Sequence, residues 1–187
     1  KLNKQVFPEY INLVDDPKFP GVINFDYNSE GHIYNRVPLI ENGVFKNFIV
    51  DNYYGHKTGL TKNGASADCL VIGKGDKELT EMISGVKKGL YISNLHYINF
   101  NNVKETSITG LTRDGTFYIE DGELKNVINN LRFTVKISDV IKNITELENK
   151  HSFVPSSDNY GDFGITSSAA PHVKVSSFKI TSSTRTI

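Results

Sequence analysis

The residues best suited to bind a metal ion are scattered along the chain. No two histidines have the His-Glu-x-x-His spacing that brings two imidazoles of a helix to one zinc ion. We therefore predict separate surface or half-buried histidines, and no metal ligand within this chain; a site assembled from distant histidines is the alternative. The five are His32, His56, His96, His151 and His172.

Cys69 is the only cysteine, which excludes an internal disulfide framework and a cysteine-built zinc site. A nucleophilic cysteine needs a positive environment and a base. Cys69 lies instead within the apolar residues 67–72, which is typical of a small buried hydrophobe. A lone thiol is also compatible with a reducing compartment, and we expect a cytoplasmic protein.

Two basic, glycine-containing stretches remain as candidate sites. Residues 73–76 (Gly-Lys-Gly-Asp) precede an expected helix, but they lack the spacing of a phosphate-binding loop, and Asp76 would repel a phosphate. Residues 56–64 either bind a carboxylate or a peptide terminus, or form a solvated loop. No spacing pairs two carboxylates as acid and base, so we predict no catalytic residue.

Composition excludes several classes of protein. The chain has 187 residues with 21 Lys and Arg against 21 Asp and Glu, so no electrostatic argument favours nucleic-acid binding. Hydrophobic residues make up 38% and charged residues 22%, which is typical of a globular protein and not of a disordered one. No apolar run approaches the ~20 residues that span a bilayer. The length suits one domain, or two small ones that share a core.

Strand signals dominate the sequence. Asn42-Gly43 and Asp121-Gly122 are preferred hairpin turns, because these residues tolerate positive φ. Pro38 predicts an edge position or a bulge in its strand. The expected strands cover residues 11–14, 22–27, 32–40, 44–50, 67–72, 90–92, 97–100, 107–111, 116–120, 123–127, 131–135 and 172–180.

Two helices are expected, over residues 77–88 and 138–149, where apolar residues recur at helical spacing. Asp76 and Ser138 are their candidate N-caps. The rest of residues 55–76, and residues 151–171, are expected to be loops. These elements predict an α+β fold with mostly antiparallel sheets and about two helices. Because the sequence begins at Lys1, we expect a piece of a longer protein.

Three stretches, in one order along nearly the whole chain, resemble the C-terminal domain of the TldD/PmbA family. The first holds an Asp-Asp-Pro turn, a Glu-Gly, a PLIE-x-G-V hairpin and a Y-x-x-K-x-G motif. The second is a GLYV-like strand, and the third resembles a TGD-x-S-x-G segment followed by IENGEI. They correspond here to Asp15-Asp16-Pro17 through Gly21, Glu30-Gly31, residues 38–44, Tyr53/Tyr54 with Lys57, Gly59 and Gly64, residues 88–95, and residues 109–115 and 118–124.

The resemblance implies a two-domain protein, of which residues 1–187 are the β-rich C-terminal domain. It also implies proteolysis, because the family is known as zinc metallopeptidases that mature ribosomally made peptides and degrade small antitoxins; some members were described as modulators of DNA gyrase. TldD-type subunits carry a His-Glu-x-x-x-His helix in the preceding half and a late cysteine ligand. PmbA-type (TldE) subunits lack these ligands and partner the catalytic chains.

Residues 159–164, which correspond to the late cysteine segment, read Asn-Tyr-Gly-Asp-Phe-Gly without a cysteine. The resemblance therefore favours the PmbA-like partner, with no cofactor in this chain and zinc in the full-length protein or its partner. It implies a peptide substrate and a homodimer, or a heterodimer with a TldD-type subunit. Two alternatives stay open: a non-enzymatic dimerisation or scaffold domain, and a catalytic TldD-like protein whose zinc motif lies upstream.

The loops over residues 54–64 and 158–168 are the expected walls of a peptide cavity. The expected substrate-binding residues are Tyr54, His56, Lys57, Gly64 and Tyr160.

Overall fold

The computed structural model describes residues 1–28, 30–155 and 166–183 of the chain. These divide into two compact units. Unit 1 comprises Lys1–Gly75 and Asn149–His172, and unit 2 comprises Asp76–Glu148 and Val173–Ile187. Among the described residues, no helix is both long and apolar enough to cross a membrane.

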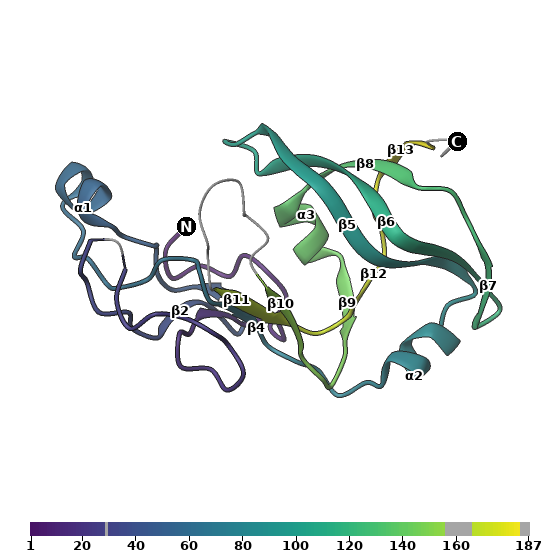
Figure 1. The fold of residues 1–187 in the computed structure, drawn as a ribbon, viewed down its shortest axis with the longest axis horizontal. Coiled ribbons are helices and arrows are strands. Elements are labelled where there is room, and N and C mark those ends of the chain that lie inside the picture. Colours follow the sequence, from purple (N-terminus) through teal and green to yellow (C-terminus); the bar gives the residue numbers. More distant parts are fainter. Residues whose placement is uncertain (29, 156–165, 184–187) are drawn as a thin grey trace. The chain divides into compact units, whose positions relative to one another are not determined.

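Unit 1 is built on a six-stranded sheet in the order β10-β11-β4-β1-β2-β3 (Figure 1). The sheet is antiparallel except where β11 pairs with β4. At that pair the buried Ala169 faces the buried Val71, so the parallel contact lies in the core. The strands are β1 (Leu13–Asp15), β2 (Val37–Glu41), β3 (Val44–Phe45), β4 (Leu70–Ile72), β10 (Ser152–Pro155) and β11 (Ser167–Ala170).

The first predicted hairpin is confirmed, with shorter strands than expected. Asn42 and Gly43 have φ of 49° and 73° between β2 and β3. Pro38 is not on an edge strand, because β2 lies between β1 and β3. The bulge is confirmed: the β1–β2 register shifts between Leu13 and Val14, and Val14 faces Pro38. The irregular register accommodates a residue that has no N–H to donate.

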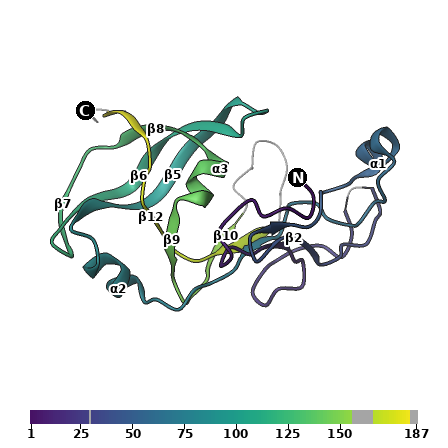
Figure 2. The same ribbon diagram turned by 180° about the vertical axis from the view of Figure 1, so that it is seen from behind.

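Unit 2 contains a five-stranded antiparallel sheet, in the order β13-β8-β6-β5 with β7 also paired to β6, and a small β12–β9 sheet (Figure 2). Phe133 of β8, which is fully buried, lies at its core with Val135 and Ile119. The strands are β5 (Lys88–Asn102), β6 (Ser107–Glu120), β7 (Glu123–Val127), β8 (Leu131–Lys136), β9 (Ile144–Leu147), β12 (Val173–Val175) and β13 (Ile180–Ser183).

The strands of unit 2 are longer than the sequence predicts. The expected strands at 90–92 and 97–100 belong to one strand, β5, and those at 107–111 and 116–120 to β6. The register of β5 and β6 shifts at three places, which lets two long strands stay paired through irregular sequence. The Asp121-Gly122 hairpin is confirmed, with φ of 48° and 80°.

Both predicted helices exist, but each is shorter than expected. Helix α2 (Leu79–Ser84) begins after Glu78 and not after Asp76, and it ends at Gly85 before Gly89 is reached. Helix α3 (Ile137–Lys142) ends at Asn143, and Ile144 and Leu147 are buried in strand β9 instead. The three-residue spacing of Ile144 and Leu147 fits the apolar stripe of a helix, but their pairing with β12 makes this segment a strand.

Four further expectations are corrected. Residues 52–58 form helix α1 (Asn52–Thr58) where a loop was expected to begin at residue 55. Residues 22–27 form no strand and contribute only the bridge from Tyr27 to Ile33. The expected 151–171 loop contains β10 and β11, and the expected final strand divides into β12 and β13. The α+β class with mostly antiparallel sheets is confirmed.

Candidate functional site

A buried carboxylate anchors the loop that leads into β4. Asp15, at the end of β1, is 2% exposed. Its carboxylate accepts hydrogen bonds from the backbone N–H groups of Ser66 at 2.6 Å, Ala67 at 2.9 Å and Cys69 at 3.3 Å. Ala67 has a φ of 65°, so the chain turns tightly around the carboxylate. The Asp-Asp-Pro motif therefore does more than make a turn: its first residue fixes a segment some fifty residues later in the sequence.

Cys69 is enclosed by the same arrangement and is fully buried, as the sequence predicts. Burial, followed by the negative charges of Asp15 and Asp68, raises the pKa of the Cys69 thiol from 9.0 to about 12. Asp68 accepts a hydrogen bond from the Tyr34 hydroxyl at 2.8 Å. The thiol therefore stays protonated at neutral pH, which suits neither a nucleophile nor a metal ligand.

The side chains that the structure describes do not form a zinc site. Thiolate and imidazole are the ligands that zinc prefers, and Cys69 offers a buried thiol with a raised pKa. Across residues 1–28, 30–155 and 166–183, no three His, Cys, Asp or Glu side chains gather closely enough to hold an ion.

Three of the predicted substrate-binding residues, Tyr54, His56 and Lys57, lie on helix α1. Asp51 caps this helix, because its side chain accepts the N–H of Tyr54 at 2.7 Å, and Gly59 ends it with a φ of 73°. None of its seven residues is buried. His56 and Lys57 lie in its last turn, where positive charge is favoured by the helix dipole.

Polar contacts from two other segments hold α1 in place. The Glu30 carboxylate accepts the backbone N–H of Asn52 at 3.2 Å. Lys62 donates to the Asn52 side chain at 2.7 Å and lies 3.8 Å from Glu30. The helix is thus fixed at its first residue, while its side chains project from unit 1.

The exposed face of α1 combines two phenol rings with an ammonium group. Tyr53 and Tyr54 are 62% and 51% exposed, and their rings meet edge to face at 5.1 Å. Lys57 donates to the Tyr53 hydroxyl at 3.2 Å and lies 5.2 Å from the centre of that ring. This arrangement can bind a peptide carboxylate or carbonyl, or stack on an apolar side chain, and it contains no paired acid and base.

Gly64 has a backbone role in the structure. Its φ is 76°, and a Cβ atom there would come within 2.8 Å of the carbonyl oxygen of Ile33 and the side chain of Asn35. Asn35 donates its N–H to the Gly64 carbonyl at 3.3 Å. Gly64 therefore lets the loop after α1 pass against residues 33–35, and the structure does not bring it to the Tyr53–Lys57 pair. Tyr160 and most of the 158–168 loop lie outside the described residues, and Ser167 and Ser168 belong to β11.

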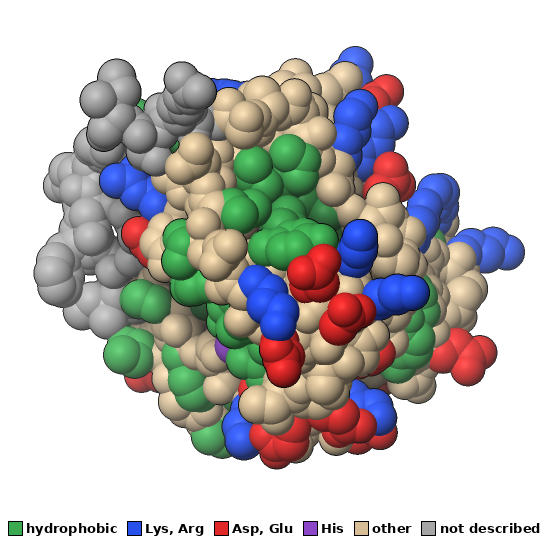
Figure 3. Space-filling view, turned by 90° about the vertical axis from the view of Figure 1, so that its right-hand side faces the viewer, with side chains coloured by type: hydrophobic (Ala, Val, Ile, Leu, Met, Phe, Trp, Pro, Cys, Tyr) green, Lys and Arg blue, Asp and Glu red, His purple; other side chains and the backbone are tan. Residues whose placement is uncertain are grey.

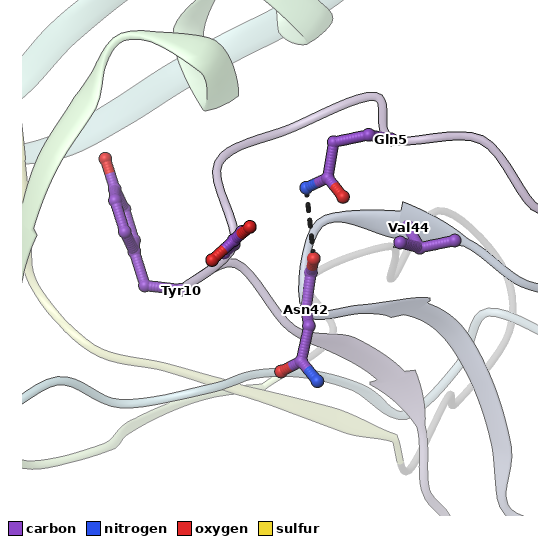
Figure 4. A pocket seen from close by; sticks show the side chains of 5 residues that line it. Gln5, Tyr10, Asn42 and Val44 are labelled. Atoms are coloured by element: carbon purple, nitrogen blue, oxygen red, sulfur yellow. Dashed lines mark hydrogen bonds between the residues drawn. The ribbon is translucent and has the colours of Figure 1, made fainter.

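Among the hollows formed by the described residues of unit 1, two are considered for the site, and neither is lined by Tyr54, His56, Lys57 or Gly64. The larger, of about 700 Å³, lies where the Gln5 side chain donates to the carbonyl of Asn42 at 3.0 Å (Figure 4). The smaller, of about 260 Å³, includes Leu60 to Asn63 of the loop that follows α1. Its other lining residues are Leu2, Lys46, Asn47, Phe48 and Val50.

Comparison with known protein families shows which family the chain belongs to. The model of the PmbA/TldA metallopeptidase C-terminal domain matches residues 1–182. The chain belongs to this family. The resemblance in the motifs and the match of the family model agree over almost the entire sequence.

Relatives of this PmbA/TldA domain include both named branches of the family. A zinc metalloprotease TldD homolog of Saccharolobus solfataricus is 25% identical over 194 residues, covering 95% of this chain and 43% of that protein. A metalloprotease PmbA homolog of Buchnera aphidicola is 22% identical over 152 residues, covering 79% of this chain and 33% of that protein. The chain therefore spans less than half of the length of these relatives.

The fold of the PmbA/TldA domain is shared with a solved structure. TldE from Thermococcus kodakarensis superimposes with a TM-score of 0.80 and 23% identity, over 96% of this chain and 41% of that one. Sequence reasoning missed two features of the domain, the Asp15 anchor and the contact of Glu30 with α1. The family motifs contain both residues, but the pairing of each with a distant backbone N–H has no local signal.

Proposed function

We propose that this domain belongs to a subunit of a peptidase complex and is its PmbA-like member, which binds and presents peptide while a TldD-type subunit holds the zinc. Membership of the PmbA/TldA family supports the link to proteolysis. A TldE structure shares the fold. The observation that carries the proposal is the state of Cys69: the only thiol is enclosed and protonated, so the chain offers no thiolate to a metal.

Helix α1 is the proposed contact with the peptide. Its Lys57, Tyr53 and Tyr54 are exposed and held together in one cluster. An ammonium group beside aromatic rings suits the carboxylate terminus or the backbone carbonyls of an extended peptide, which a sequence-tolerant peptidase must hold without side-chain selection. The loop from α1 to Gly64 would form one wall of the cavity.

The test is peptide cleavage by the full-length protein reconstituted with a TldD-type partner. We expect Lys57→Ala to raise KM about threefold to tenfold, since one exposed charge-assisted hydrogen bond is lost. Lys142→Ala is the matched control, because Lys142 also lies in the last turn of a short helix, α3. An unchanged KM for Lys57→Ala would show that α1 does not contact the peptide. Equal cleavage by the partner alone would refute the role of this subunit.

A scaffold role is the second candidate function, favoured by the exposed apolar residues of unit 2. It predicts association without any effect of this chain on cleavage.

A further inference from the structure

The smaller hollow of unit 1, of about 260 Å³, lies against helix α1. Two of its lining residues approach the helix backbone: a Cβ atom added at Gly55 would lie 3.3 Å from the Leu60 carbonyl oxygen and 3.8 Å from Cγ1 of Val50. A third, Lys62, donates to the side chain of Asn52, the first residue of α1, at 2.7 Å. A ligand on α1 therefore has this hollow beside it.

The walls of this hollow are largely apolar and are held together. Leu2, Phe48 and Leu60 are 43%, 46% and 42% exposed, whereas Val50 is 4% exposed. The Asn63 side chain donates to the Phe48 carbonyl at 2.7 Å, which ties the loop after α1 to the segment that follows β3. Half-exposed apolar side chains around a preformed hollow provide a surface on which a ligand can bury an apolar group.

The charged residues of the lining are both lysines. Nine of the described residues line the hollow, and of these only Lys46 and Lys62 carry a charge. Each ammonium lies 3.8 Å from a carboxylate that does not line the hollow, Glu41 for Lys46 and Glu30 for Lys62. That distance is beyond hydrogen-bond range, and an ammonium has three N–H donors. The two lysines therefore keep donors for an anionic ligand.

Two other surfaces differ in charge. Among the described residues, Glu9 is the only charged one that lines the larger hollow, where it would repel a carboxylate. In unit 2, Val127 of β7 is 67% exposed on a strand that also carries the ion pair of Glu123 with Lys125. Figure 3, which faces the side on which β7 and α2 lie in Figure 1, shows hydrophobic side chains beside both acidic and basic ones. Of these three surfaces, the smaller hollow combines apolar walls with positive charge alone.

We propose that the smaller hollow binds the C-terminal residue of a peptide, with the side chain on Phe48 and Leu60 and the carboxylate on Lys46 and Lys62. A volume of about 260 Å³ holds about eight or nine water molecules at ~30 Å³ each. This suits one leucine-sized residue with its carboxylate, and not a helix or a folded domain. The peptide reaches the hollow along α1, where Lys57 meets a backbone carbonyl.

Charge complementarity supports a peptide terminus as the occupant. If a purely apolar partner covered the two ammonium groups, they would lose water without gaining an acceptor. A carboxylate instead accepts charge-assisted hydrogen bonds from both. The inference rests on the proposed function and specifies its substrate class, which is peptides whose unblocked C-terminal residue is apolar.

The first test measures binding of labelled alanine-rich pentapeptides to the full-length protein alone, by fluorescence anisotropy. The reference peptide carries an N-terminal fluorescein and ends in leucine with a carboxylate; the others end in leucine amide or in glycine. We expect the amide and the glycine peptide each to bind about tenfold more weakly, because one loses charge-assisted hydrogen bonds and the other loses apolar contact. Equal binding of the three, or no binding of any, would overturn the proposal. Displacement by N-acetylleucine as strong as by the unlabelled pentapeptide would indicate a site for small apolar acids and would also overturn it.

The second test assigns the carboxylate to Lys46. In Lys46→Met, which keeps the length of the side chain, we expect the preference for acid over amide to fall from about tenfold to about threefold or less. Lys74→Met is the matched control, because Lys74 is an exposed lysine of unit 1 that lines neither hollow. Thermal melts confirm that both variants are folded. A preference that is undiminished in Lys46→Met, or reduced equally in Lys74→Met, would overturn the proposal.

The outcomes separate this inference from the proposed function. Cleavage by the complex that depends on Lys57 but not on Lys46 would refute only the role of the hollow. A carboxylate preference that needs Lys46, in a protein whose Lys57→Ala variant cleaves with unchanged KM, would retain the carboxylate site and refute the contact of α1 with the peptide.

Discussion

The segment from α1 to β4 is built in opposite ways at its two ends. At one end, the backbone of residues 66–69 wraps around the Asp15 carboxylate, which is 2% exposed, and Cys69 is enclosed with it. At the other end, α1 has no buried residue and is held by surface contacts from Glu30 and Lys62. The unreactive thiol of Cys69 is thus enclosed at the buried end of this segment, and the groups available to a ligand lie on the helix at its exposed end.

This contrast predicts the largest effect at Asp15. We expect Asp15→Ala to lower the free energy of unfolding by on the order of 3–5 kcal/mol, because the buried N–H of Cys69 and the part-buried N–H groups of Ser66 and Ala67 lose a charged acceptor. Asp16→Ala, its neighbour, should cost only about 1 kcal/mol, since it removes an ion pair to the exposed Arg36. Urea unfolding of both variants measures the difference. Equal costs would show that Asp15 is no anchor.

The Cys69 thiol predicts how stability depends on pH. Its pKa is raised on folding, so its contribution is complete below pH 9.0 and is lost as the pH rises toward about 12. Over that range we expect the wild type to lose about 1.4 kcal/mol per pH unit more than Cys69→Ala. Parallel urea titrations of the two proteins measure this. Curves that stay parallel to pH 12 would contradict an enclosed, protonated thiol.

Two glycines, Gly59 at the end of α1 and Gly64 in the loop that follows, test the contrast between the exposed and the packed end of this segment. Gly59 and Gly64 have φ of 73° and 76°, but a Cβ at Gly59 meets nothing within 4 Å, whereas at Gly64 it meets the Ile33 carbonyl at 2.8 Å. We expect Gly59→Ala to cost about 1 kcal/mol and Gly64→Ala about 2–4 kcal/mol, from the left-handed backbone and the added clash. Thermal unfolding of both variants measures these costs. A larger loss of stability in Gly59→Ala than in Gly64→Ala would contradict the close packing at Gly64.

The smallest effect on stability is expected on the exposed face of α1. Lys57→Ala removes an exposed contact with Tyr53 and should change the free energy of unfolding by less than about 0.5 kcal/mol. A change in KM without a change in stability would then assign Lys57 to ligand binding. A loss above about 1 kcal/mol would show that α1 depends on this contact for its structure.

The sequence predicted features whose causes are local. Asn42-Gly43 and Asp121-Gly122 form the expected turns because two adjacent residues can both adopt positive φ. Helix α1 has no buried stripe and therefore no apolar periodicity, although its Asp51 and Gly59 caps were visible signals. Ile144 and Leu147 carry a helical spacing, but the distant β12 pairs with them as a strand.

The candidate site could be predicted only in part for the same reason. Tyr54, His56 and Lys57 were found through a motif and lie together on α1. The role of Gly64 depends on Asn35, and that of Asp15 on Ser66 and Ala67, which are brought together only by the fold.

Elemental analysis for zinc tests the central claim most directly, on the full-length protein purified alone and then in complex with a TldD-type subunit. We predict no stoichiometric zinc in the protein alone, and one zinc per catalytic partner in the complex. Stoichiometric zinc in the protein alone would contradict the account, because it would place the catalytic metal in the chain that carries this domain.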